Sequence, residues 1–431
     1  MSLGFIVCLV VLFGITALGA PIPLTIIGAS VVYLAIEGRD LGLAAEQMLQ
    51  GVMNNFIILA VPLFILAAAI MNASTISDRL MEFCMALVGR YRGGLAYLNI
   101  LTSVVFSGMS GSAVADVAGI GKITTDIMTK GGRYSAGYAG ALTAATAAIG
   151  PLIPPSIPLV MYALVSDVSI GYLFLAAIVP GLLMVAFITI HTFFLARSRN
   201  FPVEAPVRIR ELPGVTFRAV PALLMPVILL GGIYGGAVTP TEAAALAAAY
   251  ALLLAIFFYR AFSWRSLYAV ISESARSSAG IGLLIASATI LNYIVASENI
   301  PALVGDALRG TGLSPLGFML LVNVILLFLG TLLDVAVIIL VIMPIFIPTA
   351  AALGIDPIHF GVVAVANAMI GLITPPFGMM LFVTNAVVGI PMRAMVREIW
   401  GLIAILVAAL VVIILVPEIS LWLPRLFGHG T

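Results

Sequence analysis

GPLIPPS at residues 150–156 and GLITPPF at residues 371–377 each place two adjacent prolines inside a long apolar segment. Proline lacks an N–H donor and obstructs the bond to the carbonyl four residues earlier, so each pair interrupts a helix and frees backbone oxygens. Within a membrane such backbone is tolerated only where it faces protein, water or an ion. Gly371 follows Gly150 by about 221 residues, so the two stretches indicate an internal repeat with one broken helix in each half.

A second element recurs about 45 residues before each proline pair. Apolar blocks at 94–130 and 315–353 are interrupted by small and polar residues, SGMSGS at 107–112 and GTLLD at 330–334. Half-segments of about 12 to 15 residues, at ~1.5 Å per residue, are too short to cross a ~30 Å hydrocarbon core. Both blocks are therefore predicted to be re-entrant hairpins with their tips in mid-membrane.

Composition places the whole chain in a membrane, because 63% of its 431 residues are hydrophobic and only 9% are charged. Apolar segments of spanning length recur from end to end. We predict an all-α polytopic fold of about ten spans plus two re-entrant hairpins, in two inverted-topology repeats. The expected spans are 4–20, 21–37, 52–73, 136–166, 170–196, 218–235, 240–259, 277–297, 358–388 and 398–416.

The distribution of lysine and arginine predicts the orientation of the two halves. Most of these residues fall on one side, predicted to be cytoplasmic: Arg90, Arg92, Lys122, Lys130, Arg133, the loop 197–218, Arg260, Arg265, Arg393 and Arg397. Arg39 and Arg309 are exceptions. The segment from Gly310 to Met392 has no lysine or arginine, so the second hairpin is expected to enter from the opposite side. Both termini are then expected on the periplasmic side.

Several classes of function are disfavoured by what the sequence lacks. A net charge of +1 gives no dense basic face for nucleic acid. The sequence has no G-x-x-x-x-G-K-[ST] loop for nucleotide hydrolysis. Cys8 and Cys84 have no metal-ligand spacing. We therefore expect no nucleic-acid partner, no resident cofactor and no ATPase domain in this chain.

The alternatives left for a membrane chain are an enzyme, a channel or a transporter. GMSG at 108–111 matches the G-x-S-G of intramembrane serine proteases, but none of His191, His359 and His429 pairs obviously with Ser110 as a base. A channel usually builds its carbonyl ring from several subunits, whereas two different half-sites in one chain suit alternating access. A transporter that is not an enzyme is the favoured interpretation.

Three acidic positions have competing interpretations. Thr239, Pro240 and Glu242 have the spacing of a helix-capping box, which we favour over a functional role. Asp334, just after the second hairpin tip, could cap the following half-helix or act in the membrane interior, and Asp116 has the same ambiguity.

Four motifs give the sequence a resemblance to a known family: SGMSGSA at 107–113, GPLIPPS at 150–156, TPTEAA at 239–244 and GLITPP at 371–376. Together they resemble the large membrane subunit of the tripartite ATP-independent periplasmic (TRAP) transporters, of dicarboxylate-transporter M type. The resemblance implies an elevator mechanism in a bacterial inner membrane, coupled to Na⁺. It also implies two partner chains, a small four-span membrane subunit and a soluble periplasmic substrate-binding protein, with a small organic acid anion as substrate. A stand-alone ion-coupled carboxylate transporter or antiporter of similar fold is the alternative.

The resemblance also implies domains and site residues. The expected segments are scaffold helices at 1–93, the first hairpin and broken helix at 94–166, further scaffold helices at 167–314, the second hairpin and broken helix at 315–388, and a C-terminal span and tail at 389–431. The first sodium site would use Ser107, Ser110, Gly150, Ile153 and Pro154. The second would use Gly330, Gly371, Thr374 and Phe377. Candidate substrate contacts are Ser112, Ser156, Asp334, Asn367 and Asn385.

Overall fold

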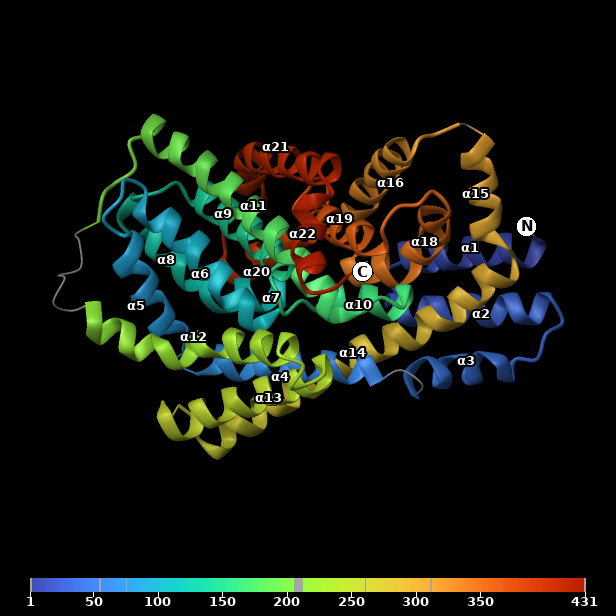
Figure 1. The fold of residues 1–431 in the computed structure, drawn as a ribbon, viewed down its shortest axis with the longest axis horizontal. Helices are drawn as coiled ribbons and strands as arrows, with labels where there is room; N and C mark the ends of the chain where they lie inside the picture. Colours follow the sequence, from blue (N-terminus) through green and yellow to red (C-terminus); the bar gives the residue numbers. More distant parts are fainter. Residues whose placement is uncertain are drawn as a thin grey trace.

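The structure is a computed structural model that describes residues 2–53, 56–74, 76–204, 212–259, 261–310 and 312–429. All regular elements within these ranges are helices, which confirms the predicted all-α class for the described part of the chain. The helices form two groups, a lower layer and a larger upper group (Figure 1). Residues 205–211 of the predicted cytoplasmic loop, and Arg260, lie outside the described ranges.

The lower layer is organised around the longest helix, α14 (Trp264–Ser297), which crosses it diagonally in Figure 1 and packs against α2, α3 and α4. α13 packs against α4, and its start has the predicted capping box of Thr239 and Glu242. The other members of the layer are α1 (Leu3–Ala17), α2 (Ile22–Ile36), α3 (Gly42–Met53), η1 (Phe56–Leu59), α4 (Ala60–Ala73), α12 (Leu212–Tyr234), α13 (Pro240–Leu253) and the π-helical η5 (Leu254–Phe258).

A polar junction holds the end of α14 against α1 and α2. The carboxylate of Glu298 accepts hydrogen bonds from the Ser2 amide (2.8 Å), the Ser2 hydroxyl (2.7 Å) and the Tyr33 hydroxyl (2.9 Å). Burial alone would raise the pKa of Glu298, but these hydrogen bonds outweigh it and hold the pKa below its ordinary value. The junction therefore favours the ionised carboxylate.

Two helical hairpins lie in the upper group at the predicted positions. In each, the first arm is a single helix and the returning arm contains a π-helical turn. The elements of the first are α6 (Gly94–Ser110), α7 (Ala113–Asp116), η2 (Val117–Gly121) and α8 (Lys122–Thr129). Those of the second are α16 (Pro315–Gly330), α17 (Val335–Val337), η6 (Ile338–Ile342) and α18 (Met343–Ala352). The first is preceded by α5 (Ile76–Val88) and the second by α15 (Ile300–Gly310).

The helix breaks at both proline pairs, as predicted. α9 (Ala136–Ile149) ends in a short 3₁₀ turn, η4 (Gly150–Leu152), and the chain resumes at a bend of 43° as α10 (Ile157–Ser166). α19 (Pro357–Gly371) is likewise followed by α20 (Met379–Val388). The Pro154–Pro155 and Pro375–Pro376 peptide bonds are both cis. The upper group is completed by η3 (Lys130–Gly132), α11 (Ile170–Ser198), α21 (Met392–Leu415) and α22 (Glu418–Leu426).

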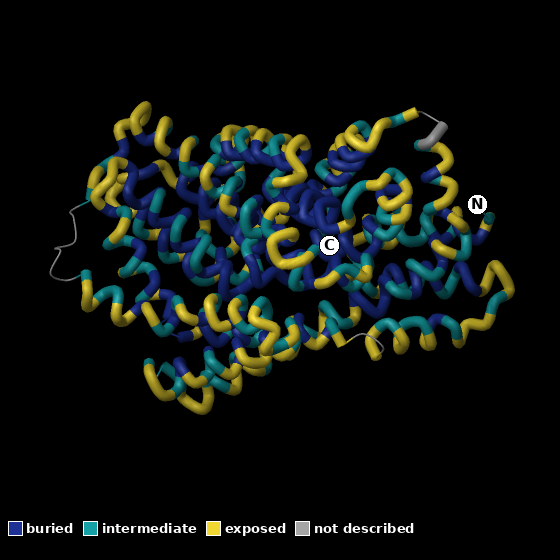
Figure 2. Tube along the Cα trace, viewed as in Figure 1, coloured by how far each residue is buried: buried dark blue, intermediate teal, exposed yellow. Residues whose placement is uncertain are grey.

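Seven helices in the described residues are long and apolar enough to cross a membrane, or eight if α9 and α10 count as one bent span. The prediction of about ten spans counted several shorter apolar helices, including α1 and α2, so that number stays a prediction. One of these seven is Val335–Ala352, the returning arm of the second hairpin, so length alone does not distinguish a re-entrant arm from a span there. Many large apolar side chains are exposed, as expected for contact with lipid. Figure 2 shows exposed residues along the outer faces of both groups of helices.

Ion pairs connect several of the segments predicted to face the cytoplasm. Arg133 pairs with Glu204 (3.1 Å), Arg199 at the end of α11 pairs with Glu398 of α21 (2.8 Å), and Arg218 of α12 pairs with Glu82 of α5 (3.2 Å). Each pair brings two of the chain segments into contact. That all the segments in the predicted set lie on one side of the membrane, and that this side is cytoplasmic, stays a prediction.

Candidate functional site

A cavity of about 300 Å³ lies where both hairpin tips and both helix breaks meet. Its upper-group lining comes from the tips (Gly111, Ser112, Ala113, Val114, Asp334, Val335, Ala336) and from the broken helices (Pro151, Ile157, Pro158, Met161, Met369, Leu372, Met379, Met380). Pro23 of α2 and Gly280, Ile281 and Leu284 of α14 close it from the lower layer. The cavity therefore lies at the interface between the two groups of helices.

Two polar residues at the hairpin tips line this cavity. Ser112 caps α7, its hydroxyl accepting from the amide of Ala115 (3.4 Å), and Asp334 caps α17, its carboxylate accepting from the amide of Ala336 (2.8 Å). No lysine or arginine is among the described lining residues. An anion in this cavity would therefore be met by helix N-termini and the Ser112 hydroxyl, and the Asp334 carboxylate is the one charged side chain in the described lining.

The first half-site joins a hairpin tip to the break in the same half. Ser107 on α6 lies so close to Gly150 that a methyl group on Gly150 would overlap the serine side chain. The Ser107 hydroxyl donates to Asp116 Oδ2 (3.3 Å), and the Ser103 hydroxyl donates to the same oxygen. Asp116 is fully buried, and its Oδ1 has no hydrogen-bond partner. This cluster therefore offers hydroxyl, carbonyl and carboxylate oxygens, the ligands preferred by hard cations.

The second half-site has the same arrangement with different chemistry. A methyl group on Gly330 would lie 2.9 Å from the Cα of Gly371, so α16 and α19 meet backbone to backbone. The Thr374 amide donates to the Gly371 carbonyl (2.9 Å), as the Ile153 amide donates to the Gly150 carbonyl (2.8 Å). Each break therefore begins with the same turn, and each carbonyl retains a second lone pair for another ligand.

An asparagine bridge connects hairpin and broken helix in each half. Asn99 of α6 donates to Thr143 (2.7 Å) and accepts from Thr146 (2.9 Å) of α9. In the second half, Asn367 of α19 donates to the side chain (2.7 Å) and backbone (2.8 Å) carbonyl oxygens of Asn323 on α16. Thr146 and Asn367 differ by the same 221 positions as the two breaks. The two bridges therefore start from equivalent positions on the broken helices, whereas their hairpin partners, Asn99 and Asn323, differ by 224 positions.

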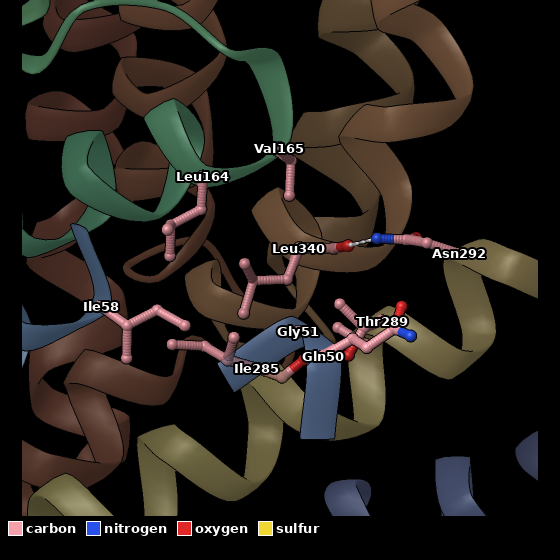
Figure 3. Close-up of a pocket in the computed structure, with 10 residues that line it drawn as sticks. Gln50, Gly51, Ile58, Leu164, Val165, Ile285, Thr289, Asn292 and Leu340 are labelled. Atoms are coloured by element: carbon pink, nitrogen blue, oxygen red, sulfur yellow. Dashed lines mark hydrogen bonds between the residues drawn. The ribbon is translucent and has the colours of Figure 1, made fainter. Parts of the chain in front are cut away.

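A second pair of asparagines connects the lower layer to the two hairpins. Asn72 of α4 donates to the Ala115 carbonyl (3.0 Å), and Asn292 of α14 donates to the Leu340 carbonyl (3.1 Å). Both acceptors lie in the returning arms, beside or within the π-helical turns. Figure 3 shows the second contact at the edge of a smaller pocket of about 230 Å³ between α14, α10 and η6. In both asparagines Oδ1 is buried without a partner.

The comparisons with known proteins agree on one family. Residues 9–419 match the family described as "Tripartite ATP-independent periplasmic transporter, DctM component". The sialic acid TRAP transporter large permease protein SiaM of Vibrio cholerae is 39% identical over 97% of this chain and 98% of its own length. The chain belongs to the DctM family of TRAP transporters. The C4-dicarboxylate TRAP transporter large permease protein DctM of Pseudomonas aeruginosa is 40% identical over 87% of this chain and 88% of that protein.

A likeness to a solved structure supports the fold of this DctM-family chain. The YdaH transporter of Alcanivorax borkumensis covers 86% of each chain with a TM-score of 0.56 at 16% identity. At this identity the likeness concerns the fold alone. Together with its apolar helices, the family membership makes this chain a multi-pass membrane permease.

The predicted site residues fall into three groups. Ser107, Ser110, Gly150, Ile153 and Pro154 lie at the first tip and break, and Gly330, Gly371, Thr374 and Phe377 lie at the second. Ser112 and Asp334 line the central cavity, whereas Ser156, Asn367 and Asn385 do not. Ser156 caps α10 (Leu159 amide, 3.2 Å). Asn385 donates to the Ile390 carbonyl (2.7 Å) at the far end of α20.

Four asparagines at this site were not proposed as ligands or anchors from the sequence: Asn99, Asn323, Asn72 and Asn292. The sequence left Asp116 open between a cap and a role in the membrane interior, and in the structure Ser112, not Asp116, caps α7. The available signal was a polar side chain within an apolar helix, which is costly in a membrane and tends to be functional. Among the described residues no histidine is hydrogen-bonded to Ser110: its hydroxyl accepts from the Ser112 amide (3.4 Å), and His429 pairs with Asp356 (3.0 Å).

Proposed function

We propose that this chain is the sodium-coupled membrane subunit that moves a small organic acid anion across the bacterial inner membrane by an elevator mechanism. The observation that carries the proposal is the central cavity, in which two hairpin tips and two broken helices converge against α2 and α14. Its volume of about 300 Å³ is at the lower end of the ~300–1,000 Å³ usual for small-ligand sites. The site therefore suits a compact substrate.

Sodium would bind where each tip meets the break of its own half. The described residues contain no cluster of His, Cys, Asp and Glu that would suit a transition metal, whereas both half-sites are rich in backbone and hydroxyl oxygens. Asp116 Oδ1, buried and unpartnered, is a further oxygen for a cation in the first half-site. Two bound cations would place positive charge beside the cavity and favour an anion within it.

The substrate class follows from the relatives and from the cavity. Sialic acid and C4-dicarboxylates, named for the two relatives above, are both carboxylates. A carboxylate in this cavity would meet the N-terminal ends of α10 and α20, and Ser112 would supply a hydroxyl. We propose a small carboxylate of one of these classes.

Movement would occur between the two groups of helices. The cavity, the Asn72 contact and the Asn292 contact all lie at their interface, so transport would require these two hydrogen bonds to break and re-form. Assembly is proposed from the tripartite family: a small four-span subunit beside the lower layer and a periplasmic binding protein that loads the cavity.

Reconstitution tests the proposal. The chain would be placed in liposomes alone, with its small subunit, and with both the small subunit and the binding protein outside, each with and without an inward sodium gradient. Uptake of radiolabelled sialic acid or succinate is expected only in the complete system with sodium. Uptake by the chain alone would support the stand-alone carboxylate transporter, and uptake that ignores sodium would refute the coupling.

A further inference from the structure

A surface groove that the transport site does not use lies on the other side of the first hairpin from that site. It has a volume of about 920 Å³ and runs between α6, from Tyr97 to Val104, and α11, from Leu182 to Arg197. Several of its side chains, including Ile190 and Phe194, are exposed, so the groove opens onto the outer surface of the protein. Its walls are apolar along most of their length, which makes it a site for an apolar ligand within the membrane.

Positive charge gathers at one end of this groove. Arg92 and Arg197 line that end, and no acidic residue is among the described lining residues. The guanidinium of Arg197 stacks 4.0 Å from the ring centre of Phe193, and that of Arg92 donates to Asn200 Oδ1 (3.3 Å). Both guanidinium groups have further N–H donors, so they can bind a phosphate as well.

The length of the groove matches one leaflet of a bilayer. The sixteen residues from Leu182 to Arg197 span about 22 Å at a rise of ~1.5 Å per residue. Half of a ~30 Å hydrocarbon core plus one headgroup region has a similar depth. Tyr91 and Tyr97 lie at the arginine end, as tyrosines do at membrane interfaces. The groove thus has a headgroup end and an acyl-chain end.

We propose that this groove binds one anionic phospholipid, its phosphate held by Arg92 and Arg197 and its acyl chains lying between α6 and α11. By the lysine and arginine distribution, the lipid belongs to the cytoplasmic leaflet, where basic pockets between helices select anionic headgroups. The opposite face of α6 carries Asn99, Ser103 and Ser107, which hold α9 and Asp116. The lipid therefore packs against the helix that supports the first half-site.

The test measures lipid binding to the purified chain by native mass spectrometry and by thermal stability in detergent. Phosphatidylglycerol is expected to bind about tenfold more tightly than phosphatidylcholine and to raise the Tm by a few degrees more. The double variant Arg92→Gln/Arg197→Gln should lose this preference. Arg393→Gln/Arg397→Gln removes the same charge at exposed positions outside the groove and should keep it. Val104→Trp, which fills the apolar end, should weaken binding of both lipids.

Four results would overturn the proposal. One is an equal phosphatidylglycerol preference in the wild type and the Arg92/Arg197 variant, and another is an equal loss in the Arg393/Arg397 control. The third is a cross-link from Ile190→Cys to the small membrane subunit in the assembled complex, which would show that a protein covers the groove. Glycerol 3-phosphate should not raise the Tm, and a rise equal to that with phosphatidylglycerol would assign the arginines to a free phosphate instead.

Discussion

The two half-sites have one architecture and two chemistries. In the first, a buried carboxylate, Asp116, is bonded by hydroxyl groups, and Asn99 joins the hairpin to threonines of α9. In the second, the hairpin meets α19 through the Gly330–Gly371 backbone contact and an amide pair, Asn323 with Asn367. The second half has no acid at the position of Asp116, since the residue 221 positions later is Val337.

This difference indicates which features the architecture requires. Both halves have a broken helix, a close contact between tip and break, and a polar bridge between the hairpin and the broken helix. The bridge consists of amide and hydroxyl groups in the first half and of two amides in the second, so side chains diverge while the glycine and proline positions recur. Five experiments test how far the two halves differ.

The largest expected effect is an all-or-none difference in labelling. In a background without the buried Cys8 and Cys84, Lys130→Cys marks the base of the first hairpin and Ala352→Cys the base of the second. If the halves are inverted, an impermeant thiol reagent applied to intact spheroplasts should modify Ala352→Cys and leave Lys130→Cys unmodified. Equal labelling of the two positions would contradict the inverted repeat.

Restoring a continuous helix at either break should nearly abolish sodium binding at the half-site that contains it. Replacing Pro154-Pro155 or Pro375-Pro376 with Ala-Ala restores N–H donors that compete for the freed carbonyls. We expect the sodium concentration for half-maximal uptake to rise about 100-fold, or about 2.8 kcal/mol, in either variant. Pro221→Ala/Pro226→Ala, within the continuous helix α12, is the matched control. Normal sodium activation in one Ala-Ala variant would remove that half-site from the proposal.

The asparagine bridges should differ in their contribution to stability. Asn99→Leu removes bonds with Thr124, Thr143 and Thr146 and should lower the free energy of unfolding by about 2 kcal/mol. Asn367→Leu leaves the Asn323 side chain without its donor and should cost about 1 kcal/mol. Thermal unfolding in detergent measures both. A larger loss in Asn367→Leu would reverse the ranking of the two bridges.

Replacing the two hairpin acids, Asp116 and Asp334, should change sodium affinity by different amounts. Asp116→Asn removes a buried negative charge beside Gly150, and we expect sodium affinity to fall about tenfold, or about 1.4 kcal/mol. Asp334→Asn keeps a side chain that caps α17 equally well, so its sodium affinity should change less than about threefold. Sodium titration of uptake in the complete system compares them. Equal effects would mean that Asp116 has no special role in the first half-site.

The smallest effect concerns the contacts between the two groups of helices. Asn72→Leu and Asn292→Leu each remove one hydrogen bond to a hairpin, worth about 1 kcal/mol, and should shift the conformational equilibrium about fivefold. Distances between spin labels on α14 and α18 would report the populations. Unchanged populations in both variants would show that these bonds do not hold the present arrangement.

The membrane class, the hairpins and the two helix breaks could be predicted from the sequence. They depend on local chemistry, because proline interrupts a helix wherever it lies and a long apolar segment must be buried in a membrane or in a protein core. The bounds 94–130 and 315–353 expected for the hairpins agree with helices that run from Gly94 to Thr129 and from Pro315 to Ala352. The capping box at Thr239 was predictable for the same reason.

Which polar groups meet depends on the tertiary structure. A serine just before a proline, as at Ser156, is a cap signal, but nothing near Asn367 or Asn385 in the sequence indicates that they serve a bridge and a turn rather than the cavity wall. Likewise, Asn72 and Asn292 contact residues more than 40 positions away, and Pro23 and Gly280 reach the cavity from another layer. Such contacts depend on how the helices pack, because the direction of a side chain on a helix is local but its partner is not.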